Sequence, residues 1–396
     1  MIRKSYRYII LWCGLVVCLP PIARAQRTAL LDSIEAHNTT LRALRAESEA
    51  QRLMFGSDSR LPDPELEVDY MLGSPKGVPN RTNVSFSQSL DWGVLTGRRK
   101  DMSLAGGALA AASLRKDRQV VLSDALRQLT WMIYWNRQCR DLKQRLKLAR
   151  EVQALYQKKY EQGGVNAIEV NKVKLNTSVA QAELRRAISE RQSVQLELNR
   201  LNGGRLLECV DTAYADEELP PLPQLLKTVE DRHPQMESAR AAWEQSKSQV
   251  RLMQAMSWPM FSVGFTGEYV RGNNYSGISL GVSLPLWGNT RSRIRQSKAE
   301  ALSRQLEVDD VRTGLSAEVV RQYHAASDLR STADSLQTDL KALGNDLLLR
   351  RALDEGQISL LDYLLELSFY YTVRTAQLEA ERDAQLATAQ LRSFLY

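Results

Sequence analysis

Four segments of the chain alternate between apolar and polar positions, and they occur as two pairs. The first pair covers about residues 65–72 and 83–91, and the second covers about 260–270 and 277–287. In the first segment Leu66 and Val68 alternate with acidic residues, and in the fourth Ile278 and Leu280 alternate with Ser and Gly. A period of two predicts β-strands with one apolar and one polar face. Tyr and Trp residues near their ends are typical of strands that cross a membrane.

Two folds are compatible with these strands. A soluble β-sandwich would bury the apolar faces in its core, but four strands are few for that fold. A membrane barrel needs about eight strands or more, and an open sheet edge in lipid leaves backbone groups without hydrogen-bond partners. If the strands cross a membrane, several chains must therefore share one barrel.

Helices are predicted around the strands. Residues 28–55 and 225–256 are rich in good helix formers, and residues 104–160 and 292–353 contain no proline. A helix of nearly sixty residues is roughly 90 Å long, so such helices must pack along one another. The partner helix of the first carries a seven-residue repeat, which predicts a left-handed coiled coil. The repeat is formed by Val173, Ala180, Ala187, Val194 and Leu201.

The chain contains the same plan twice. Residues 161–170 match residues 354–363 at an offset of 193, and residues 90–93 match residues 285–288. Each half is predicted to form a helix, two strands, a long helix, a turn and a helix. We predict two structural repeats, residues 26–202 and 225–396, joined by a proline-rich acidic linker at 203–224. The predicted fold is mainly α with a small transmembrane β part.

Residues 1–25 have the pattern of a secretory signal peptide. Arg3, Lys4 and Arg7 precede an apolar run at 9–19, and Ala23 and Ala25 form a small-x-small cleavage signal. The run is short for a bilayer span, so a membrane anchor is the less favoured alternative.

The net charge and the mean hydropathy exclude two classes of protein once residues 1–25 are set aside. The formal charge of +7 and pI near 9.2 suggest a nucleic-acid partner, but residues 1–25 hold four basic and no acidic residues. The remaining +3 is spread over the chain without a basic patch, so no nucleic-acid binding is predicted. A mean hydropathy of −0.35 argues against a bundle of membrane-spanning helices, and it is compatible with strands that are apolar at alternate positions only.

No catalytic or metal-binding set is recognised in the sequence. His37, His233 and His324 are isolated in helical segments, and Cys139 and Cys209 do not form a C-x-x-C motif. We therefore predict no enzymatic activity, no cofactor and no metal site.

The duplicated plan, the two hairpin tips, Pro259 at a strand entry and Leu284-Pro285-Leu286 before Gly288 together resemble the TolC family of outer-membrane efflux proteins. The resemblance covers about residues 28–396. It implies a homotrimer in the lipid of a Gram-negative outer membrane, with a shared twelve-stranded β-barrel and a long periplasmic α-helical barrel. It further implies a passive channel that works with a periplasmic membrane-fusion adaptor and an inner-membrane pump of the RND or ABC type.

The resemblance also implies roles for particular residues. Adaptor contact would fall on the tips, at Gly163, Gly164, Val165, Gly356 and Ile358. The periplasmic gate would lie near the second tip, at Asp354, Glu355, Asp362, Tyr363 and Glu366, with Arg350 and Arg351 nearby. The acidic strand face, with Glu65, Glu67, Asp69 and Glu268, would line the barrel lumen. For each group the alternative is structural: helix caps, solvated helix ends and acidic groups that simply face water.

Two other functions remain open at this point. An outer-membrane channel for type I protein secretion uses the same architecture, and the transported substrate depends largely on the partner pump. A periplasmic coiled-coil adaptor or scaffold also has long hairpins, but normally one hairpin between compact β domains rather than two.

Overall fold

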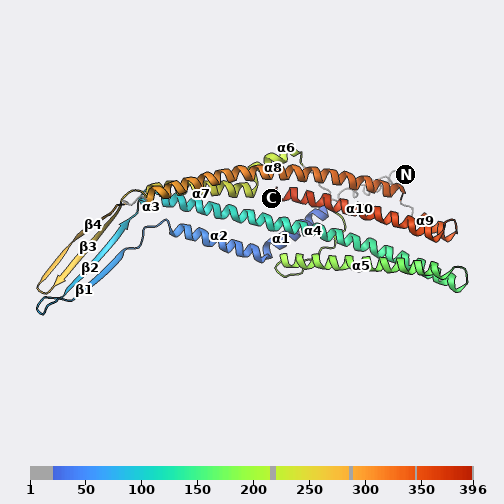
Figure 1. Ribbon diagram of the computed structural model, residues 1–396, viewed down its shortest axis with the longest axis horizontal. Helices are drawn as coiled ribbons and strands as arrows, with labels where there is room; N and C mark the ends of the chain where they lie inside the picture. The colour runs from blue at the N-terminus through green and yellow to red at the C-terminus, as the bar shows by residue number, and fades with distance from the viewer. Residues whose placement is uncertain (1–20, 215–219, 285–288, 344–345, 395–396) are drawn as a thin grey trace, which may run out of the picture. The chain divides into compact units, whose positions relative to one another are not determined.

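The computed structural model describes residues 21–214, 220–284, 289–343 and 346–394, most of which are helical (Figure 1). Contacts divide the chain into two compact units. The sheet unit comprises residues 42–119 and 227–317, and the hairpin unit comprises the residues up to Leu41, Val120–Leu226 and Glu318 onward. This division differs from the two predicted repeats, because each unit takes segments from both halves. The predicted signal peptide lies mostly outside the described residues, and Pro21 begins helix α1.

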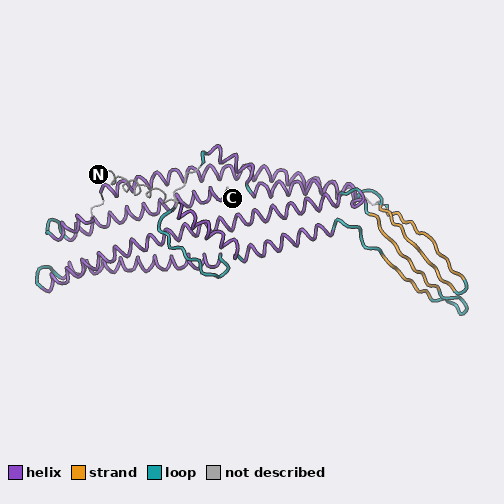
Figure 2. The backbone as a smooth tube through the Cα atoms, turned by 180° about the vertical axis from the view of Figure 1, so that it is seen from behind, coloured by secondary structure: helices purple, strands orange, loops and turns teal. Residues whose placement is uncertain are grey.

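The sheet unit contains one antiparallel sheet with the order β1-β2-β3-β4 (Figure 2). The strands are β1 (Glu65–Met71), β2 (Arg81–Leu90), β3 (Met260–Val270) and β4 (Asn273–Ser283). The register places an apolar row from Leu66 through Phe86 and Phe265 to Ile278 across the sheet. Side chains of alternate residues point to opposite faces, so this row shares the apolar face predicted from the sequence.

The fourth strand begins earlier than predicted. It was expected at about 277–287, whereas β4 starts at Asn273, directly opposite Val270 of β3. Only Arg271 and Gly272 connect the two strands, and Gly272 adopts a φ of +96°, which a residue without a side chain allows at no steric cost. The end of the predicted strand, residues 285–288, lies outside the described residues.

Two predicted helices are each divided by a capping residue. The predicted helix at 28–55 is α1 (Pro21–His37) and α2 (Thr39–Ser57), because Asn38 Oδ1 accepts a hydrogen bond from the Leu41 N–H at 2.8 Å. The predicted helix at 225–256 is α6 (Leu222–Arg232) and α7 (Pro234–Ala255). There the His233 side chain caps the new helix and Pro234 occupies its first turn, a position that proline favours.

Helices, most of them long, form the rest of both units. They are the short α3 (Trp92–Leu95), α4 (Arg98–Glu161), α5 (Ala167–Leu201), α8 (Asn289–Leu343), α9 (Asp346–Asp354) and α10 (Leu360–Ser393). The predicted helix at 292–353 is thus represented by α8 and α9, and residues 344–345 between them lie outside the described residues. No helix in the described part of the chain is both long enough and apolar enough to cross a membrane.

The seven-residue repeat of α5 lies in the core of the hairpin unit. Val173, Ala180, Ala187 and Leu201 are buried, and Val194 is half-buried against a cluster that includes Leu198 and residues of α1 and α4. Cys139 and Leu142 of α4 pack on Ala187, so small side chains let the two helices approach closely. We name the C-terminal part of α4, residues 162–166 and α5 the first hairpin, and α9, residues 355–359 and α10 the second hairpin.

Candidate functional site

Both hairpin tips end their first helix with the same glycine cap. In the first hairpin the Gly164 N–H donates to the Lys159 carbonyl at 2.8 Å, and Gly163 has a φ of +74°. In the second, the Gln357 N–H donates to the Ala352 carbonyl at 2.8 Å, and Gly356 has a φ of +72°. This is the Schellman arrangement, which places a left-handed residue just after the helix. Gly163 and Gly356 are therefore required by the backbone, whatever else they contact.

The second helix of each tip also begins in a related way. Asn166 Oδ1 accepts from the Glu169 N–H at 3.0 Å, and the Glu169 carboxylate accepts from the Asn166 N–H at 3.1 Å. Ser359 Oγ accepts from the Asp362 N–H at 3.1 Å and donates to the Asp362 carboxylate at 2.6 Å. Asp362, a predicted gate residue, thus belongs to a helix cap in the described structure.

The predicted contact residues differ in exposure. Gly163, Gly164 and Gly356 are exposed at the ends of the hairpins, whereas Val165 and Ile358 are half-buried. Val165 and Ile358 pack against one apolar cluster beneath the tips. Each tip thus exposes its glycines together with polar side chains such as Gln162 and Gln357.

This cluster, the tip core, joins the two hairpins. It contains Val152, Tyr156 and Val173 from the first hairpin and Leu353, Leu360, Tyr363 and Leu367 from the second. Tyr363 was predicted as a gate residue, but only 2% of it is exposed, so in this structure it packs in the tip core. Separating the hairpins would expose it.

The other predicted gate residues form short-range ion pairs on α9. Arg350 lies 3.3 Å from Asp354 and 3.7 Å from Glu151 of α4, and Arg351 lies 2.8 Å from Glu355. Of these three pairs, the Arg350–Glu151 pair is the one that connects the two hairpins, and its length makes it a weak one. Glu366 is exposed, and no ion pair reaches it from the described residues.

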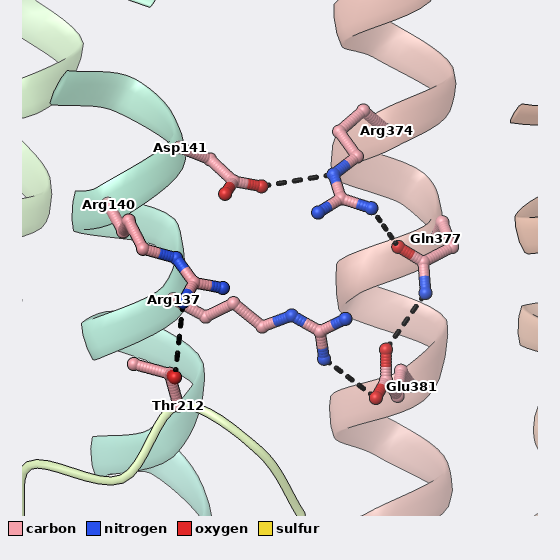
Figure 3. Close-up of polar contacts among 7 residues, drawn as sticks. All are labelled: Arg137, Arg140, Asp141, Thr212, Arg374, Gln377 and Glu381. Atoms are coloured by element: carbon pink, nitrogen blue, oxygen red, sulfur yellow. Dashed lines mark hydrogen bonds and ion pairs between the residues drawn. The ribbon is translucent and has the colours of Figure 1, made fainter. Parts of the chain in front are cut away.

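A stronger polar network between the hairpins was not predicted from the sequence. Arg374 Nε of α10 donates to Asp141 of α4 at 3.0 Å, and Arg137 of α4 donates to Glu381 of α10 at 2.7 Å (Figure 3). Gln377, which is buried, bonds to both Arg374 and Glu381 and links the two ion pairs. We call these five residues the α4–α10 network. Its charged side chains are all less than one-third exposed, so water screens them less than surface pairs.

Aromatic side chains extend this contact along both helices. The Arg382 guanidinium of α10 lies 4.6 Å from the ring centre of Trp131 and 4.7 Å from that of Tyr134 on α4. Arg145 of α4 lies 4.5 Å from the ring centre of Tyr371 on α10. Burial raises the pKa of the Tyr134 hydroxyl. These cation–π contacts add to the attachment of the second hairpin to α4.

The four predicted lumen residues lie on one face of the sheet. The register aligns Asp69 with Asn83, Asn83 with Glu268, and Glu268 with Tyr275, and Glu65 and Glu67 share their face with Asp69. Arg81 lies 2.9 Å from Glu268 and partly neutralises this face. The opposite face carries exposed apolar side chains, with Ile278 and Leu280 about 80% exposed. β1 and β4 each have a neighbour on one side only.

The residues that the structure describes contain no group of three or more His, Cys, Asp or Glu side chains that could hold a metal ion.

Comparisons with known proteins agree with this arrangement. Residues 225–395 match a family model described as outer membrane efflux protein. The outer-membrane channel OprN has a similar structure, with a TM-score of 0.81 and 17% identity, covering 94% of this chain and 90% of that one. A membrane protein from Pseudomonas aeruginosa (TM-score 0.80, 17% identity, 94% and 90% coverage) and CusC (0.78, 17%, 94% and 92%) are also similar. No curated protein sequence matches the chain.

The solved structures share the fold of this chain, and the match to the outer membrane efflux protein model falls on its second predicted repeat. The resemblance predicted from the sequence is confirmed by the match of residues 225–395 to the outer membrane efflux protein model and by the similar solved structures. The predicted fold class, mainly α with a small β part, is confirmed as well. The family and the similar structures are channels rather than enzymes.

Proposed function

We propose that three copies of this chain form the outer-membrane conduit of a tripartite efflux system. Each copy contributes four strands, so three copies close a twelve-stranded barrel around a central opening. The conduit performs no chemistry: it lets substrates pass passively from a periplasmic adaptor and an inner-membrane pump to the outside.

The sheet is the observation that carries this proposal. Its apolar face is exposed in the single chain, and its acidic face is polar enough to meet water. A barrel places the first against lipid and the second in an aqueous lumen. The free edges of β1 and β4 would each leave a row of backbone N–H and C=O groups unpaired in lipid, and pairing with neighbouring copies satisfies them.

The hairpin tips supply the proposed adaptor contact. Gly163, Gly164 and Gly356 are exposed there, with Val165 and Ile358 beside them as small apolar groups. Glycine lets a partner helix approach the backbone closely because no side chain intervenes.

The α4–α10 network supplies the proposed gate. It attaches the second hairpin to α4 through Arg374–Asp141 and Arg137–Glu381, and an opening movement of that hairpin would have to break both pairs. Asp362 and Glu366, repeated by symmetry around a narrow axis, would form an acidic ring that favours cations. The local pairs of Arg350 and Arg351 hold the tip itself together.

Single-channel recordings in planar bilayers test this function. The parent protein should form stable low-conductance channels, and Arg137→Gln with Arg374→Gln should raise the conductance because the second hairpin is released. Asp362→Ala with Glu366→Ala should also raise the conductance and reduce the preference for cations. Arg321→Gln is the matched control, since it breaks only an exposed pair with Glu318 on the same helix. Unchanged conductance in both double variants would contradict the gate, and the absence of any channel would contradict the function.

A further inference from the structure

The apolar face of the sheet leads along the chain directly to the start of helix α8. Leu280 and Val282 of β4 and Leu284 just after it are between 53% and 79% exposed. Asn289 begins α8 six residues after β4 ends at Ser283, so the start of the helix lies within about 20 Å of the end of the strand. The first turns of α8 therefore lie close to the level at which a sheet inserted in a membrane would leave the lipid.

Three cations without an ion pair lie on these first turns of α8. Arg291, Arg295 and Lys298 are four and three residues apart, so they lie on one side of the helix. All three are exposed, and no ion pair reaches any of them from the described residues. Ser297, on a different side of the helix, is buried. We call the three cations the α8 basic cluster, which was not predicted from the sequence.

No acidic side chain of the same segment compensates this charge. Residues 289–299 contain four basic and no acidic residues. The first acidic residue of α8 is Glu300, and its carboxylate accepts a hydrogen bond from Gln296. The cluster is therefore a local surplus of positive charge in a chain whose other exposed arginines are often paired with carboxylates three or four residues away.

Aromatic side chains mark the same end of the sheet. Trp258, which precedes β3, is 65% exposed, and its ring centre lies 6.2 Å from that of Trp92. The Trp92 Nε1–H donates to the Pro259 carbonyl at 2.6 Å, which fixes the entry of β3 against α3. Tryptophan is enriched where a membrane protein passes from lipid to water. These residues indicate, independently of the charges, that the helix end of the sheet lies at a membrane surface.

The first repeat has a related cation at the equivalent place. At the offset that matches residues 90–93 with residues 285–288, Lys100 of α4 corresponds to Arg295 of α8. Lys100 is exposed, and no ion pair reaches it from the described residues. Its neighbour Arg98 is paired with Asp101 at 3.1 Å, so the first repeat offers less unpaired charge than the second.

We propose that the α8 basic cluster binds the phosphate group of an anionic phospholipid in the leaflet on the helix side of the sheet. The inference rests on the proposed function, which places the sheet in a membrane, and it assigns the headgroup class and the residues that hold it. An arginine guanidinium donates two parallel hydrogen bonds to a phosphate, and a lysine ammonium adds a compact charge. A zwitterionic lipid carries its own cation beside the phosphate, so it competes poorly for a basic site.

The surroundings of the cluster favour a lipid over a soluble anion. A phospholipid can place its acyl chains on the exposed apolar face of the sheet and its phosphate at α8 at the same time. A soluble anion would contact the cations alone, and water and salt would screen that contact. Basic clusters directly beside a membrane-inserted segment bind anionic lipid headgroups by the same electrostatic attraction.

Lipid retention by the purified oligomer tests this site. The full-length protein is extracted in detergent, incubated with equal amounts of phosphatidylglycerol and phosphatidylcholine, and examined by native mass spectrometry. The parent should retain phosphatidylglycerol in preference to phosphatidylcholine. A triple variant of the cluster should retain about tenfold less phosphatidylglycerol, because the charges that attract the phosphate are removed. The variant is Arg291→Gln with Arg295→Gln and Lys298→Gln.

The chain offers a matched control with the same change of charge. Three exposed cations of α4 in the hairpin unit have the same spacing of four and three residues, and no ion pair reaches them from the described residues. The control variant is Lys143→Gln with Lys147→Gln and Arg150→Gln, and it should retain phosphatidylglycerol as the parent does. An equal loss in both triple variants would show an effect of net charge and would overturn the proposal.

Measurements on the parent decide the matter even if the triple variant does not fold. Sodium chloride should weaken the retention of phosphatidylglycerol, because exposed charges are screened. Equal retention of the two lipids would overturn the site. Displacement by inorganic phosphate beyond that caused by sodium chloride at the same ionic strength would identify a soluble anion as the ligand and would also overturn it. A trimer without lipid preference would leave the proposed function standing, whereas a monomer in the outer membrane would contradict that function itself.

Discussion

The first hairpin and the second hairpin have the same backbone geometry at their tips but different surfaces around it. Gly163 and Gly356 have φ values of +74° and +72°, and Asn166 and Ser359 cap the next helices at the same offset of 193. At that offset Arg186 corresponds to Glu379, a reversal of charge. The comparison shows that the proposed duplication keeps the residues that determine the backbone and varies exposed charged residues.

Burial differs between equivalent positions as well. Val170 and Tyr363 are both buried, but Val173 is fully buried whereas its counterpart Glu366 is exposed. The second hairpin also contacts α4 through the α4–α10 network, and at the offset of 193 the first hairpin has Gln181 in place of Arg374. The two hairpins can therefore have different roles, one as a support and the other as a moving part.

Among the substitutions considered, truncation of Tyr363 should lower the stability of the protein most. Tyr363→Ala removes a large side chain from the tip core and should cost about 3–4 kcal/mol, whereas Val173→Ala, which truncates a tip-core residue of the first hairpin, should cost about 2 kcal/mol. Thermal unfolding of the purified oligomer measures both. Equal losses would show that the tip core does not depend on the second hairpin more than on the first.

Asn38 caps helix α2 and His233, 195 residues later, caps helix α7. Acidification should destabilise the protein at His233 and not at Asn38. His233 is buried and its Nδ1 accepts from the Gln235 N–H at 3.1 Å. Burial lowers its pKa from 6.5 to about 4, so the unfolded chain binds the proton more readily than the folded one. The free energy of unfolding should be highest above pH 6.5 and fall by about 3 kcal/mol as the pH drops to 4.

The matched variant is His233→Asn, which places the cap of the first repeat at the break of the second. It keeps a side chain that can accept a hydrogen bond and removes the titration. Its melting temperature should fall less than that of the parent between pH 7 and pH 4.5. The same fall in both proteins would contradict the assignment to His233.

Substitution of the tip glycines should lower stability least, and by the same amount in both hairpins. Gly163→Ala and Gly356→Ala should each cost about 1 kcal/mol, because a Cβ at positive φ is strained although no atom lies within 4 Å of it. Gly164→Ala is the control: its φ is not in the left-handed region, so it should be close to neutral. Loss of efflux with Gly164→Ala at unchanged stability would indicate adaptor contact at this residue.

The sequence predicts those strands, turns and helix ends that depend on residues adjacent to one another in the chain. Alternation predicts the strands, and the internal repeat at an offset of 193 predicts the positions of both tips. Pro234 is a local signal for the break before α7, and Arg271-Gly272 is a local signal for the turn before β4. Helix formers surround the first and apolar alternation continues beyond the second, so these stronger patterns predict one uninterrupted helix and a later strand.

Long-range contacts could not be predicted in this way. Asp141 and Arg374 are separated by 233 residues, and neither position has a local signature that identifies its partner. The burial of Tyr363 likewise depends on Tyr156 and Val152 of the first hairpin, which reach it only through the fold.

The most direct test of the account is the mass of the assembly in the membrane where it acts. The full-length chain is produced in a Gram-negative host, its outer membrane is separated and extracted in mild detergent, and the protein mass is measured by native mass spectrometry. The account predicts an outer-membrane oligomer of three chains that forms channels when reconstituted. A monomer recovered from the periplasm without detergent would contradict it.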